Sequence, residues 1–349
     1  MSDSTSYKAV AVSTFIKKTY TDVKVYTCDS HAGSSFFHTR YTDHHIVLKH
    51  TIDTPENYKN EILSIIKKYG IDIFIPVNSA ETDIFISHKN QFSSVLSYWG
   101  DYESFKTLNE KDKLQQLCQR CGIKMPQSFG NVENVKFPVV IKPTVASSAK
   151  GVRYFANENK LENYLRSNPN LSDIIIQECI QGIGVGYSVF AVSGTIKVGY
   201  GHKRIAEYPI SGGSSMYRES FNDDRMVDIA KTLLEKTSWS GFAMFEFKLT
   251  ENNDLYLIEV NPRIWGSINQ GLQNGVNYFS VLLGKENVFV ERDINTYFSP
   301  FIYFCLLLYA LTGKFYPLIE FVKNLGRNKS DINMFKDPRG WLGSLVRLI

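Results

Sequence analysis

The sequence has 349 residues and a formal net charge of +4, and 43% of its residues are hydrophobic against 21% charged. At about 150 residues per domain, this length predicts two or three domains. The composition excludes wholesale disorder, collagen-like repeats and a small disulfide-stapled domain. An odd number of scattered cysteines and an N-terminus without a signal-peptide pattern favour a reducing, cytoplasmic location.

The first hundred residues alternate strand-like and helix-like segments. A helix is expected to begin at Pro55, which has no N–H to lose there, and to end at Gly70. Apolar or β-branched runs predict strands at residues 8–13, 23–27, 46–48 and 71–76. This alternation indicates a small α/β domain with a parallel sheet over roughly residues 1–105.

The middle of the chain has a different pattern, with pairs of strands joined by short turns. Helices are predicted at 109–122 and 223–237, and strands at 137–143, 174–177, 187–192, 195–200, 242–249 and 255–261. The turn signals between neighbouring strands indicate antiparallel hairpins. This region therefore reads as α+β.

The strongest functional signal is the hairpin over residues 241–263. Its turn is expected at residues 252–253, two asparagines, a residue type that tolerates positive φ. Opposed residues then have numbers that sum to 505, which places Glu246 opposite Glu259. Two carboxylates facing each other repel, and a divalent cation would turn that repulsion into binding.

Two further residues extend this signal. Asn261 follows Glu259 by two positions and so points to the same face of the strand. Two carboxylates and an amide oxygen suit Mg²⁺, which shares its coordination sphere with phosphate oxygens. Arg263 would be a phosphate clamp beside them. The alternative is a solvent-exposed pair of glutamates, which is common.

A second signal is the segment 137–151. Lys142 ends an apolar strand, so its stem is expected to be buried and its ammonium to need a partner. The loop that follows is small and polar, and its backbone N–H groups can fold over phosphates. Lys113 is a candidate second phosphate contact, although an exposed helix lysine is the simpler interpretation.

A third signal is the segment 174–190, which includes the glycine-rich stretch 182–186. A strand follows this stretch, whereas a Rossmann fingerprint needs a helix there. The segment reads instead as a hinge whose backbone can pair with an adenine edge, with Glu178 and Ile180 nearby. A plain turn between strands remains an equal alternative.

The order of these segments resembles the ATP-grasp superfamily, and residues 201–215 are similar to its predicted ATP-dependent carboligase branch of carboxylate–amine ligases. The resemblance implies an α/β N-terminal domain over 1–105 and an α+β ATP-grasp domain over 106–284. Two subdomains of this second domain would clamp ATP, with a lid at roughly 130–185. A mostly helical, basic and aromatic-rich tail would occupy 285–349.

The resemblance also implies roles for particular residues. Arg263 would stabilise the transferring phosphoryl group, and His202, Lys203 and Arg204 would add positive charge near it. Many members have an acidic residue soon after the hinge for the ribose hydroxyls, and here that stretch is glycine-rich. The implied nucleotide contacts are Lys113, Lys142, Ser147, Ser148, Gly151, Glu178, Cys179, Ile180 and Lys203, with Glu246, Glu259 and Asn261 as ligands of Mg²⁺ or Mn²⁺.

The function expected from this resemblance is an ATP- and Mg²⁺-dependent ligase that forms an amide from a carboxylate and an amine through an acyl phosphate. An amino acid, a peptide or an amino-sugar glycan would serve as substrate. The first alternative is a carboxylase-like enzyme that phosphorylates bicarbonate, and the second is a nucleotide-binding module without turnover. Nucleic acid is not an expected partner, because residues 1–299 are formally neutral.

The C-terminal segment carries the remaining charge. Residues 300–349 contain seven basic and three acidic residues. A helix predicted at 301–311 is too short to cross a bilayer, so we expect it to be buried in the protein. The basic, aromatic-rich tail after it could rest peripherally on an anionic membrane.

Overall fold

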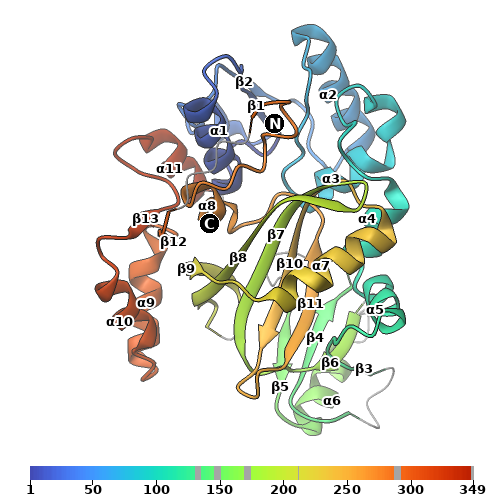
Figure 1. Ribbon diagram of the computed structural model, residues 1–349, viewed down its shortest axis with the longest axis vertical. Helices are drawn as coiled ribbons and strands as arrows, with labels where there is room; N and C mark the ends of the chain where they lie inside the picture. Colours follow the sequence, from blue (N-terminus) through green and yellow to red (C-terminus); the bar gives the residue numbers. More distant parts are fainter. Residues whose placement is uncertain (130–134, 145–150, 169–173, 211, 287–291, 347–349) are drawn as a thin grey trace.

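The computed structural model describes residues 1–129, 135–144, 151–168, 174–210, 212–286 and 292–346. A two-stranded sheet lies in the N-terminal region, a seven-stranded sheet in the middle and a four-stranded sheet near the far end. In Figure 1 the N-terminal region lies above the seven-stranded sheet, the four-stranded sheet lies below it, and the last helices run along one side.

The N-terminal region is α/β, as predicted. Its strands β1 (Tyr26–Asp29) and β2 (His44–Val47) pair in parallel. The helix predicted at Pro55 is confirmed, and Gly70 ends it with a φ of 60°. The helices of this region are α1 (Tyr7–Thr19), η1 (Ala32–Ser35), α2 (Pro55–Tyr69), α3 (Ser79–Ser87), η2 (Lys89–Phe92), α4 (Tyr102–Asn109) and α5 (Lys111–Arg120).

Residues 8–13 lie in helix α1, so the strand predicted there is wrong. Every residue of Ala9–Val12 is buried. A helix that is buried on all sides has no polar stripe, and periodicity then cannot distinguish it from a buried strand. Ser6 caps the first turn of this helix. The first residues of the chain lie beside β1 instead, because Cys28 N–H donates to the Met1 carbonyl at 3.0 Å.

The run 71–76 is extended but forms no strand of a sheet. Its backbone makes isolated hydrogen bonds instead of a ladder: Phe74 N–H donates to the Val95 carbonyl at 3.1 Å, and Ser2 N–H donates to the Ile75 carbonyl at 3.3 Å. The burial expected for this run is confirmed for Phe74 and Ile75. The predicted strand is thus replaced by an inner segment that holds the chain's first residues in place.

The seven-stranded sheet has the order β11-β10-β7-β8-β9-β12-β13. The strands from β7 to β11 are antiparallel to their neighbours, and helix α7 (Asp224–Thr237) packs on β7 and β8. The strands are β7 (Ile183–Val192), β8 (Thr195–Tyr208), β9 (Ser214–Ser220), β10 (Gly241–Leu249), β11 (Leu255–Asn261), β12 (Asn295–Tyr297) and β13 (Asn328–Ser330).

Strands β10 and β11 form the predicted hairpin and place Glu246 opposite Glu259. The turn and the register that lead to this pairing differ from the expected ones. Near the turn Leu249 pairs with Leu255, so partner numbers sum to 504 and the loop 250–254 is longer than a two-residue turn. A β-bulge next to Glu246 adds one residue on β11 and restores the sum of 505. Two deviations of one residue therefore cancel at the acidic pair.

The four-stranded sheet forms the unit expected as a lid. Its order is β3-β6-β4-β5, and helix α6 (Glu158–Ser167) accompanies it. It has a separate apolar core that includes Val139, Phe155 and Leu161. Its strands are β3 (Ser128–Phe129), β4 (Val139–Pro143), β5 (Arg153–Phe155) and β6 (Ile174–Glu178).

The C-terminal segment is helical in part, and its strands β12 and β13 extend the large sheet. Its helices, after the short α8 (Ile268–Gln273), are α9 (Phe301–Leu311), α10 (Tyr316–Lys323) and α11 (Pro338–Val346). Helix α9 was expected to be buried, but only one face is: Ile302 and Cys305 pack inward, whereas Leu307 and Leu311 are 56% and 74% exposed. No described helix is long and apolar enough to cross a membrane.

The largest apolar core joins the N-terminal region to the seven-stranded sheet. The Trp99 ring, for example, lies 5.9 Å from the Trp239 ring and 6.1 Å from the Phe242 ring, measured between centroids. The core therefore does not divide at residue 105. The boundaries 1–105, 106–284 and 285–349 stay predictions about sequence segments.

Candidate active site

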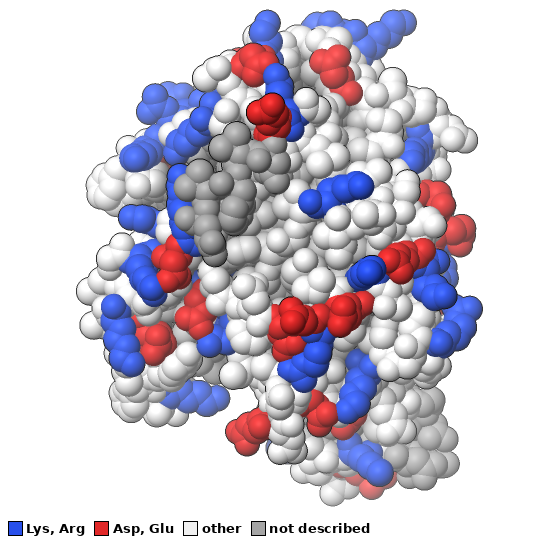
Figure 2. Space-filling view, viewed as in Figure 1, with Lys and Arg blue, Asp and Glu red and all other residues white. Residues whose placement is uncertain are grey.

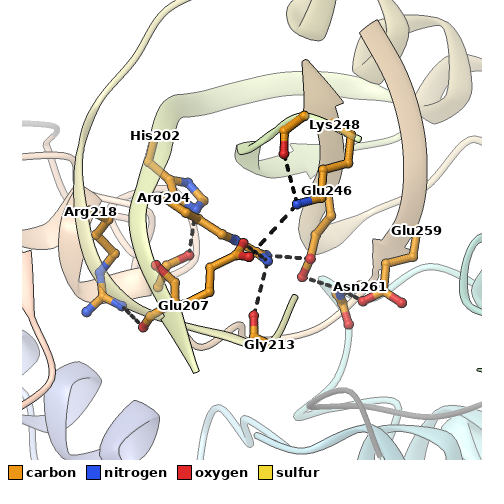
Figure 3. A network of polar contacts seen from close by, with 12 residues as sticks. His202, Arg204, Glu207, Gly213, Arg218, Glu246, Lys248, Glu259 and Asn261 are labelled. Atoms are coloured by element: carbon orange, nitrogen blue, oxygen red, sulfur yellow. Dashed lines mark hydrogen bonds and ion pairs between the residues drawn. The ribbon is translucent and has the colours of Figure 1, made fainter. Parts of the chain in front are cut away.

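Two opposed glutamates form the centre of the candidate site. Glu246 on β10 and Glu259 on β11 are cross-strand partners, and Asn261 lies on the same face as Glu259 (Figure 3). The Asn261 amide nitrogen donates to one oxygen of each glutamate, and both distances are 3.2 Å. The three side chains thus converge as their positions in the sequence predicted.

Arg204 reaches these acids from β8, across the intervening strand β7. Its guanidinium pairs with Glu246 and also with Glu207, at 3.3 Å (Figure 3). Strand β7 contributes Gly184 at the crossing point, and a Cβ there would lie 3.0 Å from the Arg204 side chain. The glycine-rich stretch is therefore part of a strand whose missing side chains let those of β8 and β10 meet.

Two lysines face the acidic pair from other elements. Lys142, at the end of β4, is 7% exposed, as expected for a buried strand-end lysine. Lys111, in the first turn of α5, is 5% exposed, and its ammonium lies 3.4 Å from a Glu259 oxygen. The site thus joins carboxylates of the large sheet to a lysine of the small sheet and a lysine of a helix.

The structure places Lys111 in the site and Lys113 outside it. The Lys113 ammonium pairs with Glu110 at 2.8 Å, and its side chain is one-third exposed. Residues two apart on a helix point about 200° apart, so only one of the two lysines can face Glu259. The sequence analysis missed Lys111. The missing signal was which face of the helix turns toward the sheet.

Replacing Lys111 by methionine is expected to raise KM for ATP by about tenfold or more, because a charge that would bind phosphate is removed from a buried site. Lys113→Met is the matched control two residues away, and it should leave KM within about twofold, as expected of an exposed side chain. Steady-state ADP release at varied ATP measures both. A larger effect at Lys113 than at Lys111 would contradict this assignment.

The charges of the site shift the pKa values of its members. Burial, and after it the neighbouring Lys111, lowers the pKa of Lys142 to about 8 against the opposing effect of the two glutamates. Burial raises the pKa of Glu246, against the attraction of Arg204. Burial acts upward on Glu259 too, but Lys111 and Lys142 outweigh it and hold the pKa of Glu259 below its usual value. Glu259 therefore loses its proton more readily than Glu246 does.

Arg263 is held rigidly beside this pair. Its Nε donates to the Ser79 hydroxyl at 2.5 Å, one Nη donates to the Ile264 carbonyl at 2.8 Å, and the other to the Asn261 side-chain oxygen. Ser79 begins helix α3 of the N-terminal region. The N-terminal region therefore positions the guanidinium that the sequence resemblance assigned to the phosphoryl group.

A pocket of about 610 Å³ lies between the two larger sheets. Arg204, the ion-pair partner of Glu246, lines it, whereas Glu246 and Glu259 themselves do not. The linker 179–182, which joins β6 to β7, forms one wall of this pocket. Cys179 N–H donates to the Pro138 carbonyl at 3.1 Å, whereas no described residue accepts a hydrogen bond from Ile180 N–H. Glu178 does not line the pocket, and its carboxylate accepts from Gln127 N–H at 3.4 Å. Of the predicted adenine contacts, the Ile180 backbone is the best placed.

Glu207 was not found by sequence analysis, yet among the described residues that line the pocket it is the only one with a carboxylate. One of its oxygens lies 2.6 Å from the position that a Cβ on Gly184 would occupy. Its side chain therefore fills the space left by the glycine after the hinge. Lys248 approaches the same carboxylate at 3.9 Å, and Lys203 also lines the pocket, so cations predominate around it.

The remaining predicted residues fall in three places. His202 is buried, and burial together with Arg204 and Arg218 lowers its pKa well below the usual value, so the positive charge expected there is wrong. Lys203 is ion-paired with Glu219. Gly151 begins the described chain again after the loop, with a φ of 77°. The predicted phosphate contacts Ser147 and Ser148 lie outside the described residues.

The donor set suits a divalent cation held partly by phosphate. No group of three or more His, Cys, Asp or Glu in the described ranges is placed to hold a metal ion alone. Glu246, Glu259 and Asn261 offer two carboxylates and an amide. Here the Asn261 nitrogen faces both acids and its oxygen accepts from Arg263, so the amide would have to turn over to present its oxygen to an ion. The three oxygen donors would then leave positions for phosphate oxygens, which is how Mg²⁺ is bound beside nucleotides. These residues therefore fit the ion.

The site therefore brings a buried lysine of one sheet close to paired acids of another. Residues 108–267 match the family model of the ATP-grasp domain. This segment of the chain is thus an ATP-grasp domain, which confirms the resemblance found in the sequence.

Part of the chain is similar to a known ligase. It is 28% identical over 165 residues to D-alanine–D-alanine ligase of Fusobacterium nucleatum, which covers 44% of this chain and 55% of that enzyme. The chain thus spans about half the length of this relative.

Solved structures share the fold. L-amino acid ligase from Bacillus licheniformis has a TM-score of 0.62 at 15% identity, covering 83% of this chain and 76% of that one. The biotin carboxylase domain of Hydrogenobacter thermophilus 2-oxoglutarate carboxylase, solved with MgADP, ADP and bicarbonate, has a TM-score of 0.65 at 14% identity, covering 82% and 69%. The carboligase branch stays a prediction.

Proposed function

We propose that this protein is an ATP- and Mg²⁺-dependent ligase that joins a carboxylate to an amine and releases ADP and phosphate. The observation that carries the proposal is the meeting of Lys111 and Lys142 with the opposed Glu246 and Glu259. Arg204, the partner of Glu246, connects this group to the pocket that it lines. The similar D-alanine–D-alanine ligase and L-amino acid ligase support this reaction class by their names.

The proposed reaction needs positioning and charge more than covalent help. An oxygen of the substrate carboxylate attacks the γ-phosphorus of ATP, the bond to the β-phosphate oxygen breaks, and ADP leaves. The amine then attacks the carbonyl of the acyl phosphate, phosphate leaves, and the amine loses its proton. Mg²⁺, when bound, neutralises phosphate charge. No Ser-His-Asp triad is required for either step.

The residues of the chain divide this work. Lys111 and Lys142 bind phosphate oxygens, and their separate elements let them approach from two sides. Glu246, Glu259 and Asn261 hold Mg²⁺, or Mn²⁺ in its place. Arg263, fixed by the N-terminal region, and Arg204, fixed by β8, orient and stabilise the transferring group through their guanidinium forks.

The substrates follow from the same proposal. The carboxylate and amine would be small molecules, with an amino acid, a peptide or an amino-sugar glycan as candidates. The names of the two similar ligases favour amino acids as the first compounds to try. The alternative of a bicarbonate-phosphorylating enzyme is favoured by the similar domain that was solved with bicarbonate.

The test is a screen of ADP release in which carboxylates are crossed with amines in the presence of ATP and Mg²⁺. The proposal expects ADP only when both partners are present, together with a condensed product by mass spectrometry. Bicarbonate-stimulated ADP release without an organic acid would favour the carboxylase alternative. ATP binding without ADP across the whole panel would favour a nucleotide-binding module and overturn the ligase.

Glu207 is expected to accept hydrogen bonds from the ribose hydroxyls of ATP. Its carboxylate belongs to the described lining of the pocket and lies beside Gly184. Many family members have an acidic residue soon after the hinge, where this chain has glycines. Glu207→Gln should weaken ATP binding by about tenfold, the usual effect of losing hydrogen bonds to a charged acceptor. It should weaken 2′-deoxy-ATP less. Isothermal titration with both nucleotides tests this, and equal weakening of the two would contradict the ribose contact.

A further inference from the structure

The two helices α9 and α10 expose an unusual concentration of apolar side chains. Among the described residues, twenty large hydrophobic side chains are exposed, and ten of them lie between positions 303 and 325. We call these ten the α9–α10 surface. They are Tyr303, Phe304, Leu307, Leu311, Phe315, Tyr316, Leu318, Ile319, Val322 and Leu325.

This surface exists because both helices are apolar on more than one face. In α9 the inward face, with Ile302 and Leu306, packs against β8 and β9, which leaves Leu307 and Leu311 facing outward. In α10 only Pro317 and Phe321 are buried. A protein surface rarely leaves so many large side chains together in water without a partner.

The charged residues around the surface are mostly basic. Lys314 and Lys329 are exposed beside the helices and pair with no described acid, whereas the exposed Lys323 pairs with Glu320 at 3.4 Å. The acids of the same segment are engaged in the protein: Asp331 is buried against Arg218, and the Glu320 carboxylate contacts Lys323 and Asn324. In Figure 1 the two helices lie along one side of the molecule, and Figure 2 shows both basic and acidic side chains on that side.

This combination identifies one partner. Aromatic and aliphatic side chains bordered by lysines are the signature of a segment that lies in the interface of a bilayer, with the cations drawn to anionic headgroups. A second copy of the chain would instead bring two basic rims together. No described helix is long enough to span the bilayer, so the contact is peripheral.

We propose that the α9–α10 surface docks this protein on the surface of an anionic membrane. The same segment lines the pocket, because Tyr309, Lys314 and Tyr316 are pocket residues and the Tyr309 hydroxyl accepts from Glu207 N–H at 3.1 Å. Docking therefore places the mouth of the candidate site beside the bilayer. The membrane contact itself does not depend on the proposed ligase reaction.

The test uses the full-length protein and sedimentation with phosphatidylcholine vesicles, with and without phosphatidylglycerol. We expect binding to the anionic vesicles that weakens with added salt. The double variant Leu311→Glu/Val322→Glu should lose at least about tenfold in partitioning, because both charged side chains would enter the apolar layer. Phe36→Glu is the matched control, since Phe36 is 73% exposed but lies in the N-terminal region.

Two further measurements test whether a loss of binding comes from unfolding and whether the lysines contribute to it. Melting temperatures of all variants should match the wild type, and Lys323→Glu/Lys329→Glu should reduce binding to anionic vesicles without altering the apolar side chains. Equal sedimentation of the wild type and the Leu311→Glu/Val322→Glu variant would overturn the proposal. So would a wild-type dimer that this variant dissociates in light scattering while neither protein binds vesicles, because the surface would then join two copies.

Discussion

Glu259→Gln is expected to lower kcat for ADP release by at least about 100-fold, the scale seen when a charge that stabilises a transition state is removed. Glutamine keeps the size of the side chain but removes the charge that a divalent ion needs. It also leaves Lys111, 3.4 Å away, without its carboxylate partner. The measurement is ADP release at saturating Mg²⁺ with whichever substrate pair the screen identifies.

The control for this variant lies in the same hairpin. Glu251 is exposed in the loop between β10 and β11, so Glu251→Gln changes the net charge equally without touching the site. It should retain activity within about twofold. Wild-type turnover in Glu259→Gln is incompatible with the metal site, whereas loss in both variants would point to the fold of the hairpin.

The kcat/KM for ATP is expected to fall as the pH rises through about 8, the value to which burial and then Lys111 lower the pKa of Lys142. The ammonium form attracts phosphate, so deprotonation removes the attraction. The limiting slope is about tenfold per pH unit for a single group. Lys142→Met should lower kcat/KM by about 100-fold at neutral pH and remove this dependence.

Lys142→Arg separates the charge from its titration. A guanidinium stays protonated at every pH used, so this variant should retain part of the activity and show no fall near pH 8. Rate measurements between pH 6.5 and 9.5, within about two units of the expected pKa, test both variants. An unchanged fall in Lys142→Arg would assign the titration to another group.

The acidic pair was predictable because it depends on one hairpin. Glu246 and Glu259 are brought together by a local turn, and the count along the two strands was right because the longer loop and the β-bulge offset each other. The strand-end position of Lys142 was equally local. Such features need only the alternation of a strand and the position of a turn.

Contacts between distant elements were not predictable in the same way. Lys111 and Lys113 are the same residue type in the same helix, and only the packing of α5 decides which one faces Glu259. Glu207 reaches the space at Gly184 through the register of β7 with β8, twenty-three positions away in sequence. A single sequence does not contain that register.

Two of the errors in the fold share one physical cause. The pattern of Ala9–Val12 was apolar throughout, and that of α9 likewise, so neither segment showed which face meets the core. The first proved to be a helix buried on every side. The second proved to be a helix with an outer apolar face, which a sequence reading assigns to the interior by default.

The separate core of the four-stranded sheet has a consequence for the proposed reaction. Lys142 belongs to that sheet, whereas Glu246 and Glu259 belong to the large one, and the linker 179–182 joins the two. A rotation about this linker would separate the lysine from the acids while both cores stay intact. In the proposed reaction, such a rotation would open the site and release the product.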